Sequence, residues 1–288
     1  MKIVFFGTSD VGLPILKALK EAGHEILEVV TSPDSPVGRK QEMTATPIAH
    51  LANELDLPIA KPEKVRGNDE FLESLRALGA DIFVVVSYGK ILPLDLIDIP
   101  PLKTVNVHFS LLPKWRGAAP IQFALLNGET KTGTTIFVLD EKVDNGPILI
   151  TEELPIQPED TFETLAPKLA ELSAELLIDL LPKYQSGEIK PQEQNFDDAT
   201  FTKIIKKEDG KIDWATMSPN EIYNMWRAYA PWPGIWTTYK GENFKILECK
   251  VNDGNLELIK VQPAGKNPMS IKDFLNGNKD FKLSDLGN

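Results

Sequence analysis

The order of apolar and polar residues predicts that the first part of the chain alternates strands with helices. Four short apolar runs have the continuity expected of buried strands: Lys2–Phe6, Ile26–Thr31, Ile82–Val86 and Thr104–His108. Between them, apolar residues recur at helical spacing in three segments: Val11–Leu19, Ile48–Leu55 and Phe71–Leu78. This alternation predicts an α/β fold, with a mostly parallel, Rossmann-like sheet and helices on both faces.

The pattern changes in the middle of the chain. Thr134–Leu139 and Ile148–Leu154 are separated by a loop rich in turn residues, Asp140–Pro147, which predicts a hairpin. A long helix is predicted over Thr161–Leu181, with one apolar stripe made of leucines: Leu165, Leu169, Leu172, Leu176 and Leu180. We expect this helix to complete a first, catalytic domain over residues 1–183.

A second, smaller domain is predicted at the C-terminal end. Residues 184–200 are polar and contain Gly187 and Pro191, so we place a linker there. Residues 201–288 combine a short helix with short strands between Gly-containing turns, a spacing that suits a small β-barrel or sandwich. The helix and strands are expected at Pro219–Ala228, Trp236–Tyr239, Phe244–Val251 and Leu256–Gln262.

The composition is that of an ordinary globular protein, with 42% hydrophobic and 25% charged residues among 288. The apolar runs are far shorter than the roughly 20 residues that span a bilayer, and the first is too short for the core of a signal peptide. The single cysteine, Cys249, excludes an internal disulfide and is expected in a buried strand. We therefore expect a cytoplasmic protein without a membrane segment.

The formal net charge of −11 argues against a protein that coats nucleic acid through bulk electrostatics. The charge is unevenly distributed along the chain. Residues 1–198 carry 18 Lys and Arg against 31 Asp and Glu, a balance of −13, whereas residues 199–288 carry 13 against 11, a balance of +2. The C-terminal part can therefore tolerate a polyanion that most of the first part repels.

Several common cofactor sites are not found in the sequence. The turn after the first strand, Gly7–Gly12, matches neither the dinucleotide-binding fingerprint nor the phosphate-binding loop. The histidines are widely spread, at His24, His50 and His108, so a zinc site with paired histidine ligands is not expected. No metal is predicted.

Two polar residues at the end of a strand are the strongest candidates for a site. Asn106 and His108 alternate along Thr104–His108 and therefore share one face, about 7 Å apart along the chain. In an open α/β sheet the carboxyl ends of the strands border the ligand-binding crevice. Hydrogen bonding into a neighbouring loop is the alternative explanation for this pair.

Motifs around this strand resemble the active-site signature of folate-dependent formyltransferases. The motifs are Asn106-Val107-His108, Ser110-Leu111-Leu112-Pro113, the run Trp115–Ile121 and Asp144-Asn145-Gly146. The run Trp115–Ile121, with later motifs at 211–214, 230–234 and 261–266, is most similar to the family members that act on methionyl-tRNA. The resemblance covers almost the whole chain and implies that the C-terminal domain is an oligonucleotide-binding (OB-like) barrel that binds tRNA.

The resemblance also implies a reaction and catalytic residues. Family members of this kind transfer the formyl group of 10-formyltetrahydrofolate to the α-amino group of methionine on initiator tRNA, for translation initiation. Attack by the amine builds an oxyanion, so the site needs a hydrogen-bond donor and a proton shuttle. We expect Asn106 to donate to the oxyanion, and His108 to donate to the oxyanion or the leaving nitrogen. Asp144 would orient His108 or accept the amine proton, although without the upstream motifs Asp144-Asn145-Gly146 is better explained as a turn.

Two loops are expected to bind the folate co-substrate. The first contributes Ser110, Leu111, Leu112 and Pro113, whose backbone lies beside the catalytic strand. The second follows Ile82–Val86 and contributes its aromatic, glycine and leucine positions: Tyr88, Gly89 and Leu92. An apolar slot with backbone hydrogen bonds suits a flat pterin, although ordinary loop packing explains Leu92 equally well.

A third loop, Ser32–Lys40, resembles the family loop that inserts at the acceptor end of tRNA. Arg39 and Lys40 are its expected tRNA contacts, because a fixed positive charge on a Gly- and Pro-containing loop suits a phosphate backbone. The sequence departs from the family pattern at three places. Arginine is usual where Ser35 stands, more basic residues are common at Gln41-Glu42, and a smaller residue is commoner at the position of Phe109.

Three other functions are compatible with parts of the sequence. They are a formyltransferase acting on an amino sugar or nucleotide, a formyltetrahydrofolate hydrolase, and a tRNA-binding protein without activity. The C-terminal domain and Trp115–Ile121 speak against the first two. The presence of Asn106, His108 and Asp144 speaks against the third, and we expect a monomer.

Overall fold

A computed structural model describes residues 1–38 and 41–287 of the chain. The chain forms two compact units, each made of segments that are not contiguous in sequence. The first comprises Met1–Ala118, Thr132–Leu154 and Ala166–Phe201, and the second comprises Ala119–Lys131, Pro155–Leu165 and Thr202–Asn288. The domain boundaries drawn from the sequence stay a prediction. Within the described residues, no helix combines the length and apolar character needed to cross a bilayer.

The first unit is built around a seven-stranded sheet. In spatial order its strands are β5 (Ile59–Ala60), β2 (Glu25–Val30), β1 (Lys2–Gly7), β6 (Ile82–Val86), β7 (Thr104–His108), β8 (Lys131–Val138) and β9 (Ile148–Pro155). The pairs from β5 to β7 are parallel, and β8 runs antiparallel to β7. The mostly parallel sheet is therefore confirmed, and the two strands of the predicted hairpin are neighbours.

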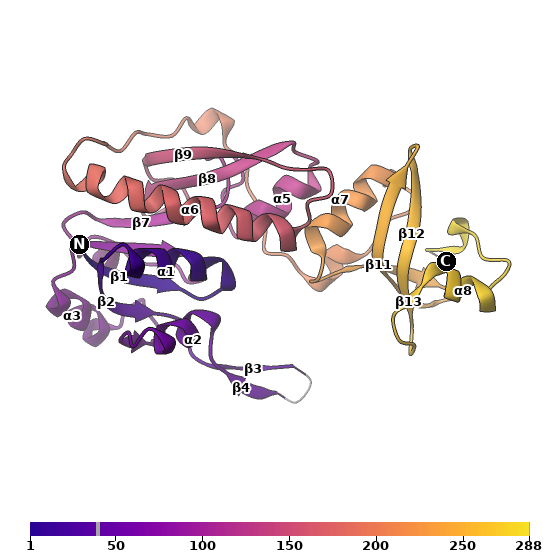
Figure 1. Ribbon diagram of the computed structural model, residues 1–288, viewed down its shortest axis with the longest axis horizontal. Helices are drawn as coiled ribbons and strands as arrows, with labels where there is room; N and C mark the ends of the chain where they lie inside the picture. Colours follow the sequence, from indigo (N-terminus) through magenta and orange to yellow (C-terminus); the bar gives the residue numbers. More distant parts are fainter. Residues whose placement is uncertain (39–40, 288) are drawn as a thin grey trace. The chain divides into compact units, whose positions relative to one another are not determined.

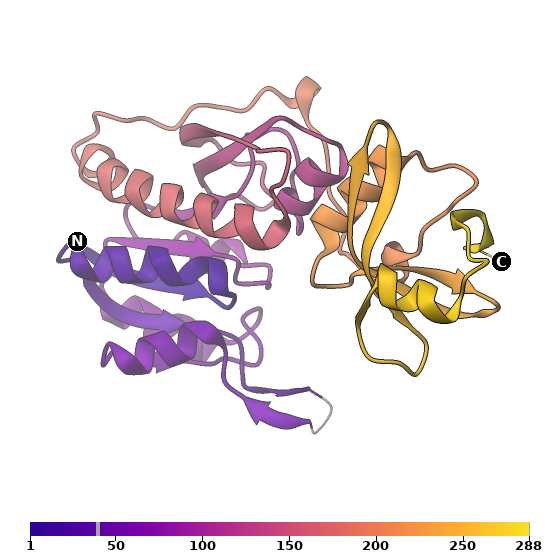
Figure 2. The same cartoon turned by 45° about the vertical axis from the view of Figure 1, so that its right-hand side comes forward.

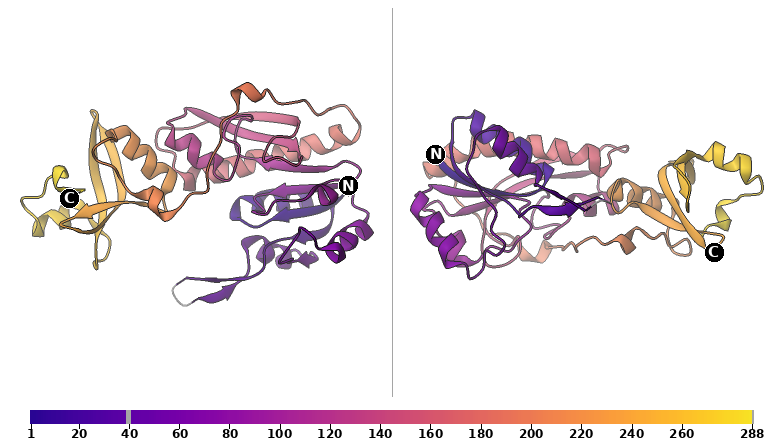
Figure 3. Two further views of the ribbon diagram at one scale, coloured as in Figure 1. Left: turned by 180° about the vertical axis from the view of Figure 1, so that it is seen from behind. Right: turned by 90° about the horizontal axis from the view of Figure 1, so that it is seen from below.

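Helices cover both faces of this sheet (Figure 1). They are α1 (Leu13–Glu21), α2 (Pro47–Glu54), α3 (Asp69–Leu78), α4 (Leu94–Ile97) and the part of α6 (Phe162–Gln185) that belongs to this unit. Residues of α3 and α4 pack on the side that carries Val4, Phe6 and Phe83. The view from below in Figure 3 shows α1 and α6 on the other side.

Local sequence explains why α3 begins and ends where it does. Asn68 caps the N-terminus, since its side-chain oxygen accepts a hydrogen bond from the Phe71 N–H at 3.2 Å. Gly79 ends the helix in the left-handed region, with φ of 61°, which glycine adopts without steric cost. The buried side chains Phe71, Leu72 and Leu75 lie on the face that meets the sheet.

α6 buries a different set of side chains from the predicted leucine stripe. Leu165, Leu169 and Leu180 are buried as predicted, but Leu172 and Leu176 are only partly buried. Ser173 and Leu177 occupy fully buried positions instead. The five-leucine stripe is therefore wrong at Leu172 and Leu176. The buried face also includes Ala166, Ala170, Ser173, Ala174 and Leu177, so its centre lies to one side of the leucines and these two fall at its edge.

A small antiparallel ribbon begins within the loop predicted at Ser32–Lys40 and extends beyond it. Its strands are β3 (Ser35–Val37) and β4 (Glu42–Thr44), and it projects away from the seven-stranded sheet (Figure 2). The β4 side chains are exposed, and Met43 is 67% exposed. Arg39 and Lys40, the predicted tRNA contacts, lie outside the described residues.

The second unit contains the predicted C-terminal β structure as a four-stranded antiparallel sheet. Its strands are β10 (Ile235–Tyr239), β11 (Glu242–Asn252), β12 (Asn255–Pro263) and β13 (Met269–Ser270), and its helices are α5 (Pro120–Leu126), α7 (Pro219–Tyr229) and α8 (Ile271–Gly277). Tyr239, Phe244, Phe274 and Phe281 form its aromatic core, with ring centroids 5.2 to 6.4 Å apart. Cys249 is buried on β11, as expected.

Candidate active site

The end of β7 carries the two polar residues singled out by the sequence. β7 ends at His108, which is 5% exposed, and Asn106 is half-buried on the same strand. Register places Asn106 opposite Phe137 and His108 opposite Thr135 on the antiparallel strand β8. The His108 ring meets the Phe137 ring edge-on, with centroids 6.5 Å apart. This packing limits the orientations that the imidazole can adopt.

Both ring nitrogens of His108 face an oxygen atom. Nε2 lies 3.0 Å from the main-chain carbonyl of Trp115, and Nδ1 lies 3.6 Å from Oδ2 of Asp144. A carbonyl can only accept, so Nε2 carries a hydrogen and donates it to Trp115. Nδ1 is the ring nitrogen that faces the Asp144 carboxylate. The structure thus brings two of the predicted catalytic residues close together at the end of β7.

The surrounding main chain holds the Asp144 side chain in place. The Gly117 N–H donates to Oδ2 of Asp144 at 2.7 Å. The Asp144 backbone has φ of 48°, a left-handed conformation that is uncommon for residues other than glycine. Gly146 follows where no side chain fits, because a Cβ there would lie 1.9 Å from the Val138 carbonyl. The loop therefore presents the carboxylate in one fixed position.

Asn106 keeps its hydrogen-bonding capacity. Within the described residues its side-chain amide has no hydrogen-bond partner, although it shares the strand face with His108. A half-buried amide without an internal partner, on the strand face that carries His108, is available to a ligand. This is the only one of the three predicted catalytic side chains that is free in this way among the described residues.

A buried arginine stands beside this pair. Arg116 is 3% exposed, and its Nη1 and Nη2 donate to the side chains of Asn145 at 3.0 Å and Gln194 at 2.6 Å. Its guanidinium lies 5.1 Å from the ring centroid of Phe196. Burial lowers the pKa of Arg116, and the negative charges of Asp144 and Asp140 partly offset this effect. The guanidinium remains charged because its ordinary pKa is far above neutral pH.

The first predicted folate-binding loop is anchored by its own backbone. Ser110 is fully buried, and its hydroxyl donates to the Lys114 carbonyl at 2.6 Å. The Leu112 N–H donates to Oγ1 of Thr135 at 3.1 Å, and the Leu112-Pro113 peptide bond is cis. Leu111 and Pro113 are partly exposed. The loop therefore offers a rigid edge beside the end of β7.

The second predicted folate-binding loop places its large side chains in the core. Tyr88 is 2% exposed, its ring meets Phe6 edge-on, and burial raises the pKa of its hydroxyl to about 12. Leu92 is 7% exposed and belongs to the same core cluster. Gly89 is exposed, with φ of 80°. In this loop the main chain around Gly89, and not the side chains of Tyr88 and Leu92, is accessible to a ligand.

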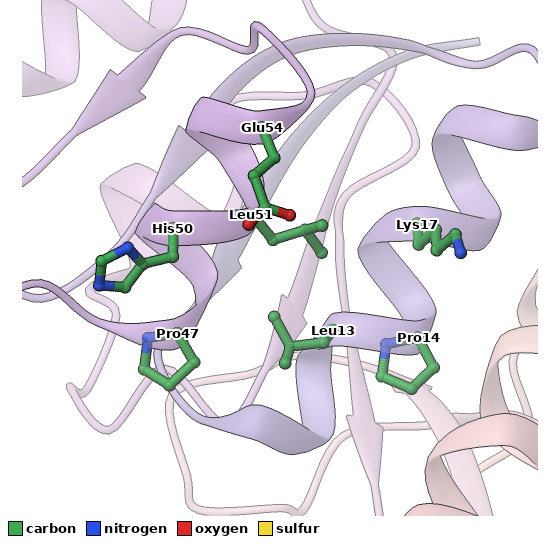
Figure 4. A pocket seen from close by; sticks show the side chains of 7 residues that line it. All are labelled: Leu13, Pro14, Lys17, Pro47, His50, Leu51 and Glu54. Atoms are coloured by element: carbon green, nitrogen blue, oxygen red, sulfur yellow. The ribbon is translucent and has the colours of Figure 1, made fainter.

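A pocket of about 520 Å³ lies elsewhere in the first unit, between α1 and α2 (Figure 4). Its lining consists of Leu13, Pro14, Lys17, Pro47, His50, Leu51 and Glu54. None of these residues was predicted to bind a substrate. Among residues 1–38 and 41–287, no group of three or more His, Cys, Asp or Glu side chains could hold a metal ion.

Comparison with known proteins assigns the family. The formyl transferase family model matches residues 1–181, and the model of the formyl transferase C-terminal domain matches residues 204–255. The chain belongs to the formyl transferase family. A methionyl-tRNA formyltransferase from Koribacter versatilis is 42% identical to this family member, covering 100% of this chain and 99% of the relative. A second, from Thermodesulfovibrio yellowstonii, is 41% identical and covers 96% of each chain.

Solved structures show the same fold for this formyltransferase. The methionyl-tRNA formyltransferase from Clostridium thermocellum superposes with a TM-score of 0.62 at 17% identity, covering 91% of this chain and 98% of that one. An N-formyltransferase from Helicobacter canadensis gives a TM-score of 0.66 at 19% identity, covering 88% of each chain. At these identities the structures support the fold alone.

Sequence reasoning did not single out Gln194 in this formyltransferase. It lies in the segment predicted to be a linker, yet it is 5% exposed and contacts the Asp144 loop. Arg116 fell within a quoted motif but received no role. No local pattern marks Gln194, since its partners lie 48 to 78 residues earlier in the chain.

Proposed function

We propose that this chain transfers the formyl group of 10-formyltetrahydrofolate to the α-amino group of methionine on initiator tRNA. The observation that carries the proposal is the His108 and Asp144 pair at the end of β7, with the free amide of Asn106 on the same strand face. Relatives that match the chain over nearly its full length are named methionyl-tRNA formyltransferases, which supports this acceptor. The chain also matches the models of both formyl transferase domains.

The chemistry exchanges one carbon–nitrogen bond for another. 10-Formyltetrahydrofolate supplies the formyl group on its N10 atom. The α-amino nitrogen attacks the formyl carbon, and the carbonyl electron pair moves onto oxygen. The bond from carbon to N10 then breaks, the amine loses one proton, and N10 gains one. The reaction therefore needs a stabiliser for the oxyanion and a group that takes a proton and returns it.

Asn106 is the proposed stabiliser of the oxyanion. Its side-chain N–H groups have no partner among the described residues, so they can donate to a substrate oxygen without breaking an internal hydrogen bond. β7 lies inside the sheet between β6 and β8, which fixes the position of the amide. A donor that is fixed before the substrate arrives does not have to reorganise during the reaction, and this lowers the barrier.

His108 and Asp144 are the proposed proton-handling pair. Oδ2 of Asp144 accepts from Gly117 and faces His108, which leaves Oδ1 as the oxygen that can receive the amine proton. His108 can donate toward the oxyanion or N10 only when its Nε2–H leaves the Trp115 carbonyl. Hydrogen bonds in ligand-free sites commonly rearrange when the substrate binds. We therefore assign Asp144 as the base and His108 as the donor.

The remaining contacts follow from the loops around this pair. We assign the folate co-substrate to the backbone edge of Ser110, Leu111, Leu112 and Pro113, and to the main chain of the Tyr88, Gly89 and Leu92 turn. Arg39 and Lys40 and the C-terminal unit are assigned to tRNA. The protein is proposed to act as a cytoplasmic monomer.

Formyl transfer with labelled donor tests the proposed function. Isotopically labelled 10-formyltetrahydrofolate is offered with methionyl initiator tRNA, methionyl elongator tRNA, an amino sugar or amino nucleotide, or buffer alone. The expected result is label in the initiator only. Label in an amino sugar or nucleotide acceptor, or release as formate, would assign a different enzyme of the same fold. tRNA binding without turnover would indicate a binding protein.

Substitutions test whether Asp144 and His108 act in catalysis or only support the fold. Asp144→Asn and His108→Ala are expected to lower kcat by about 100- to 10,000-fold, the usual contribution of acid–base groups, while tRNA binding persists. Glu141→Gln is the matched control, since Glu141 is exposed in the same loop. Wild-type turnover in Asp144→Asn would remove the proton-handling assignment.

A further inference from the structure

Gln194 is buried in a segment that has little regular structure. It follows α6, and its neighbours Glu193 and Asn195 are exposed, whereas Gln194 is 5% exposed. The preceding Gln192 pairs with Ile148 through two main-chain hydrogen bonds of 2.7 and 2.8 Å, which tie the segment to the start of β9. A glutamine side chain is rarely buried unless its amide is satisfied.

The amide of Gln194 uses both its donor and its acceptor side. Nε2 donates to the main-chain carbonyls of Asp144 at 3.1 Å and Gly146 at 2.7 Å. Oε1 accepts from Nη2 of Arg116 at 2.6 Å. Carbonyls only accept and a guanidinium only donates, so this set of partners allows one orientation of the amide. Gln194 therefore joins the backbone on both sides of Asn145 to a buried cation.

Arg116 holds the residue between those two carbonyls. Its Nη1 donates to Oδ1 of Asn145 at 3.0 Å, and Nδ2 of Asn145 donates to Asp140 at 2.6 Å. Together, Gln194 and Arg116 fix all three residues of Asp144-Asn145-Gly146. Apart from the hydrogen bond between Asn145 and Asp140, these contacts come from outside the loop and are not the internal hydrogen bonds of a turn.

The geometry of Asp144 depends on such external contacts. Its φ of 48° lies in the left-handed region, which aspartate tolerates better than most residues other than glycine, and the contacts of Gln194 and Arg116 hold the loop in this conformation. The same backbone position sets the carboxylate against the Gly117 N–H at 2.7 Å and against His108 at 3.6 Å. A change in the Asp144 or Gly146 carbonyl positions would move the carboxylate relative to the imidazole.

We infer that Gln194 is a positioning residue for formyl transfer, which clamps the carbonyls of Asp144 and Gly146 so that the Asp144 carboxylate faces His108. The inference rests on the proposed function. Gln194 acts through Asp144 and is not itself a catalytic residue. The segment after α6 thus contributes to the active site, in addition to connecting parts of the chain.

Kinetics of Gln194→Met and Gln194→Glu test the inference in the full-length protein. Methionine keeps the length of the side chain but removes every hydrogen bond. Glutamate keeps the shape and the acceptor for Arg116 but cannot donate to the two carbonyls when ionised. Gln192→Met is the matched control, because Gln192 is exposed in the same segment and pairs through its main chain. Activity is normalised to the folded fraction from urea unfolding.

The expected result is a fall in kcat of about 10- to 100-fold in both variants, the range seen when partners that orient a reactive group are removed. KM for methionyl-tRNA and for the formyl donor stays unchanged, and the pH profile of kcat is displaced, because the Asp144 carboxylate no longer lies at the same distance from the His108 imidazole. Gln192→Met behaves as the unsubstituted protein. If Gln194→Met does not fold, Gln194→Glu decides.

A folded Gln194 variant with unchanged kcat and pH profile would overturn the inference. An increase in KM at constant kcat would also overturn it, since that pattern indicates lost substrate binding and not misplacement of the carboxylate. Both outcomes leave the proposed function intact. Absence of formyl transfer in the unsubstituted protein would instead overturn the proposed function.

Discussion

The two halves of the seven-stranded sheet differ in their central strands, because β1 and β6 are apolar whereas β7 and β8 carry several buried polar side chains. We call them the apolar half and the polar half. In β1 and β6, Ile3 to Phe6 and Ile82 to Val86 are all apolar, and each is at most 7% exposed. In β7 and β8 the buried side chains include several polar ones: Thr104, His108, Thr132, Thr134 and Thr135. Strands of one sheet therefore contribute differently to the fold. The first half supplies stability by burial, which has no directional requirement.

The polar half fixes positions through hydrogen bonds. Oγ1 of Thr134 lies 3.3 Å from the His108 carbonyl and 2.7 Å from Oγ of Ser173 on α6. Oγ1 of Thr135 donates to the Ser110 carbonyl at 2.7 Å. These hydroxyls hold the backbone on both sides of Phe109, where the candidate site begins. A buried polar group left without such a partner costs stability, so the polar half specifies its geometry.

Matched phenylalanine truncations should produce the largest effects and distinguish the two halves. Phe83 in β6 and Phe137 in β8 are both fully buried. Phe83→Ala and Phe137→Ala are each expected to lower the free energy of unfolding by about 3–5 kcal/mol, through lost burial and cavity formation. Only Phe137→Ala should lower kcat of the folded protein, because its ring packs on His108. Urea unfolding and formyl transfer measure the two effects, and an equal loss of kcat in Phe83→Ala would contradict this distinction.

Reciprocal swaps of near-isosteric side chains should give intermediate effects. Thr134→Val leaves the His108 carbonyl and Ser173 without one partner, and Val84→Thr places a hydroxyl in the apolar half. Each is expected to lower the free energy of unfolding by about 1–3 kcal/mol, although the two changes are chemically opposite. Denaturant unfolding of both variants provides the measurement. If Thr134→Val raised the free energy of unfolding, the hydrogen bonds of the Thr134 hydroxyl would not be needed to hold the backbone in the polar half.

The smallest expected effect is a pH dependence in the apolar half. His24 lies just before β2, and burial, together with the positive charge of the Met1 amino group, lowers its pKa from the ordinary value of 6.5. The unfolded chain therefore binds a proton at His24 more readily than the folded one does. Stability contributed by this group is present above pH 6.5 and is lost as the pH falls below it. His24→Gln should reduce the decrease in unfolding free energy between pH 7.5 and 5.5, and an unchanged slope would contradict the assignment.

The same difference between the halves explains what the sequence could predict. β1 and β6 are continuous apolar runs, and burial on both faces follows from composition alone. The end of β7 was predictable because Asn106 and His108 interrupt an apolar strand. Tyr88 was placed correctly in a turn by sequence, but its burial in the core depends on Phe6 and other distant residues.

The unpredicted part consists of long-range polar pairs. Ser173 meets Thr134 from 39 residues away, and Gln194 meets Asp144 from 50 residues away. A serine in a helix or a glutamine in a polar segment has the same local pattern whether it is exposed or buried. Only the tertiary fold brings these side chains to their partners. Short elements such as α4 and β5 are likewise too brief to produce a detectable period.

Cys249 allows the opening of the second unit to be measured separately from that of the first. It is the single cysteine of the chain, it is 2% exposed on β11, and burial raises the pKa of its thiol to about 12. A thiol-reactive dye at pH 8 can therefore modify it only when this unit opens. The labelling rate then reports the opening equilibrium of the C-terminal unit, without contribution from the sheet that carries His108. Repeating the measurement with bound tRNA would show whether the RNA stabilises that unit directly.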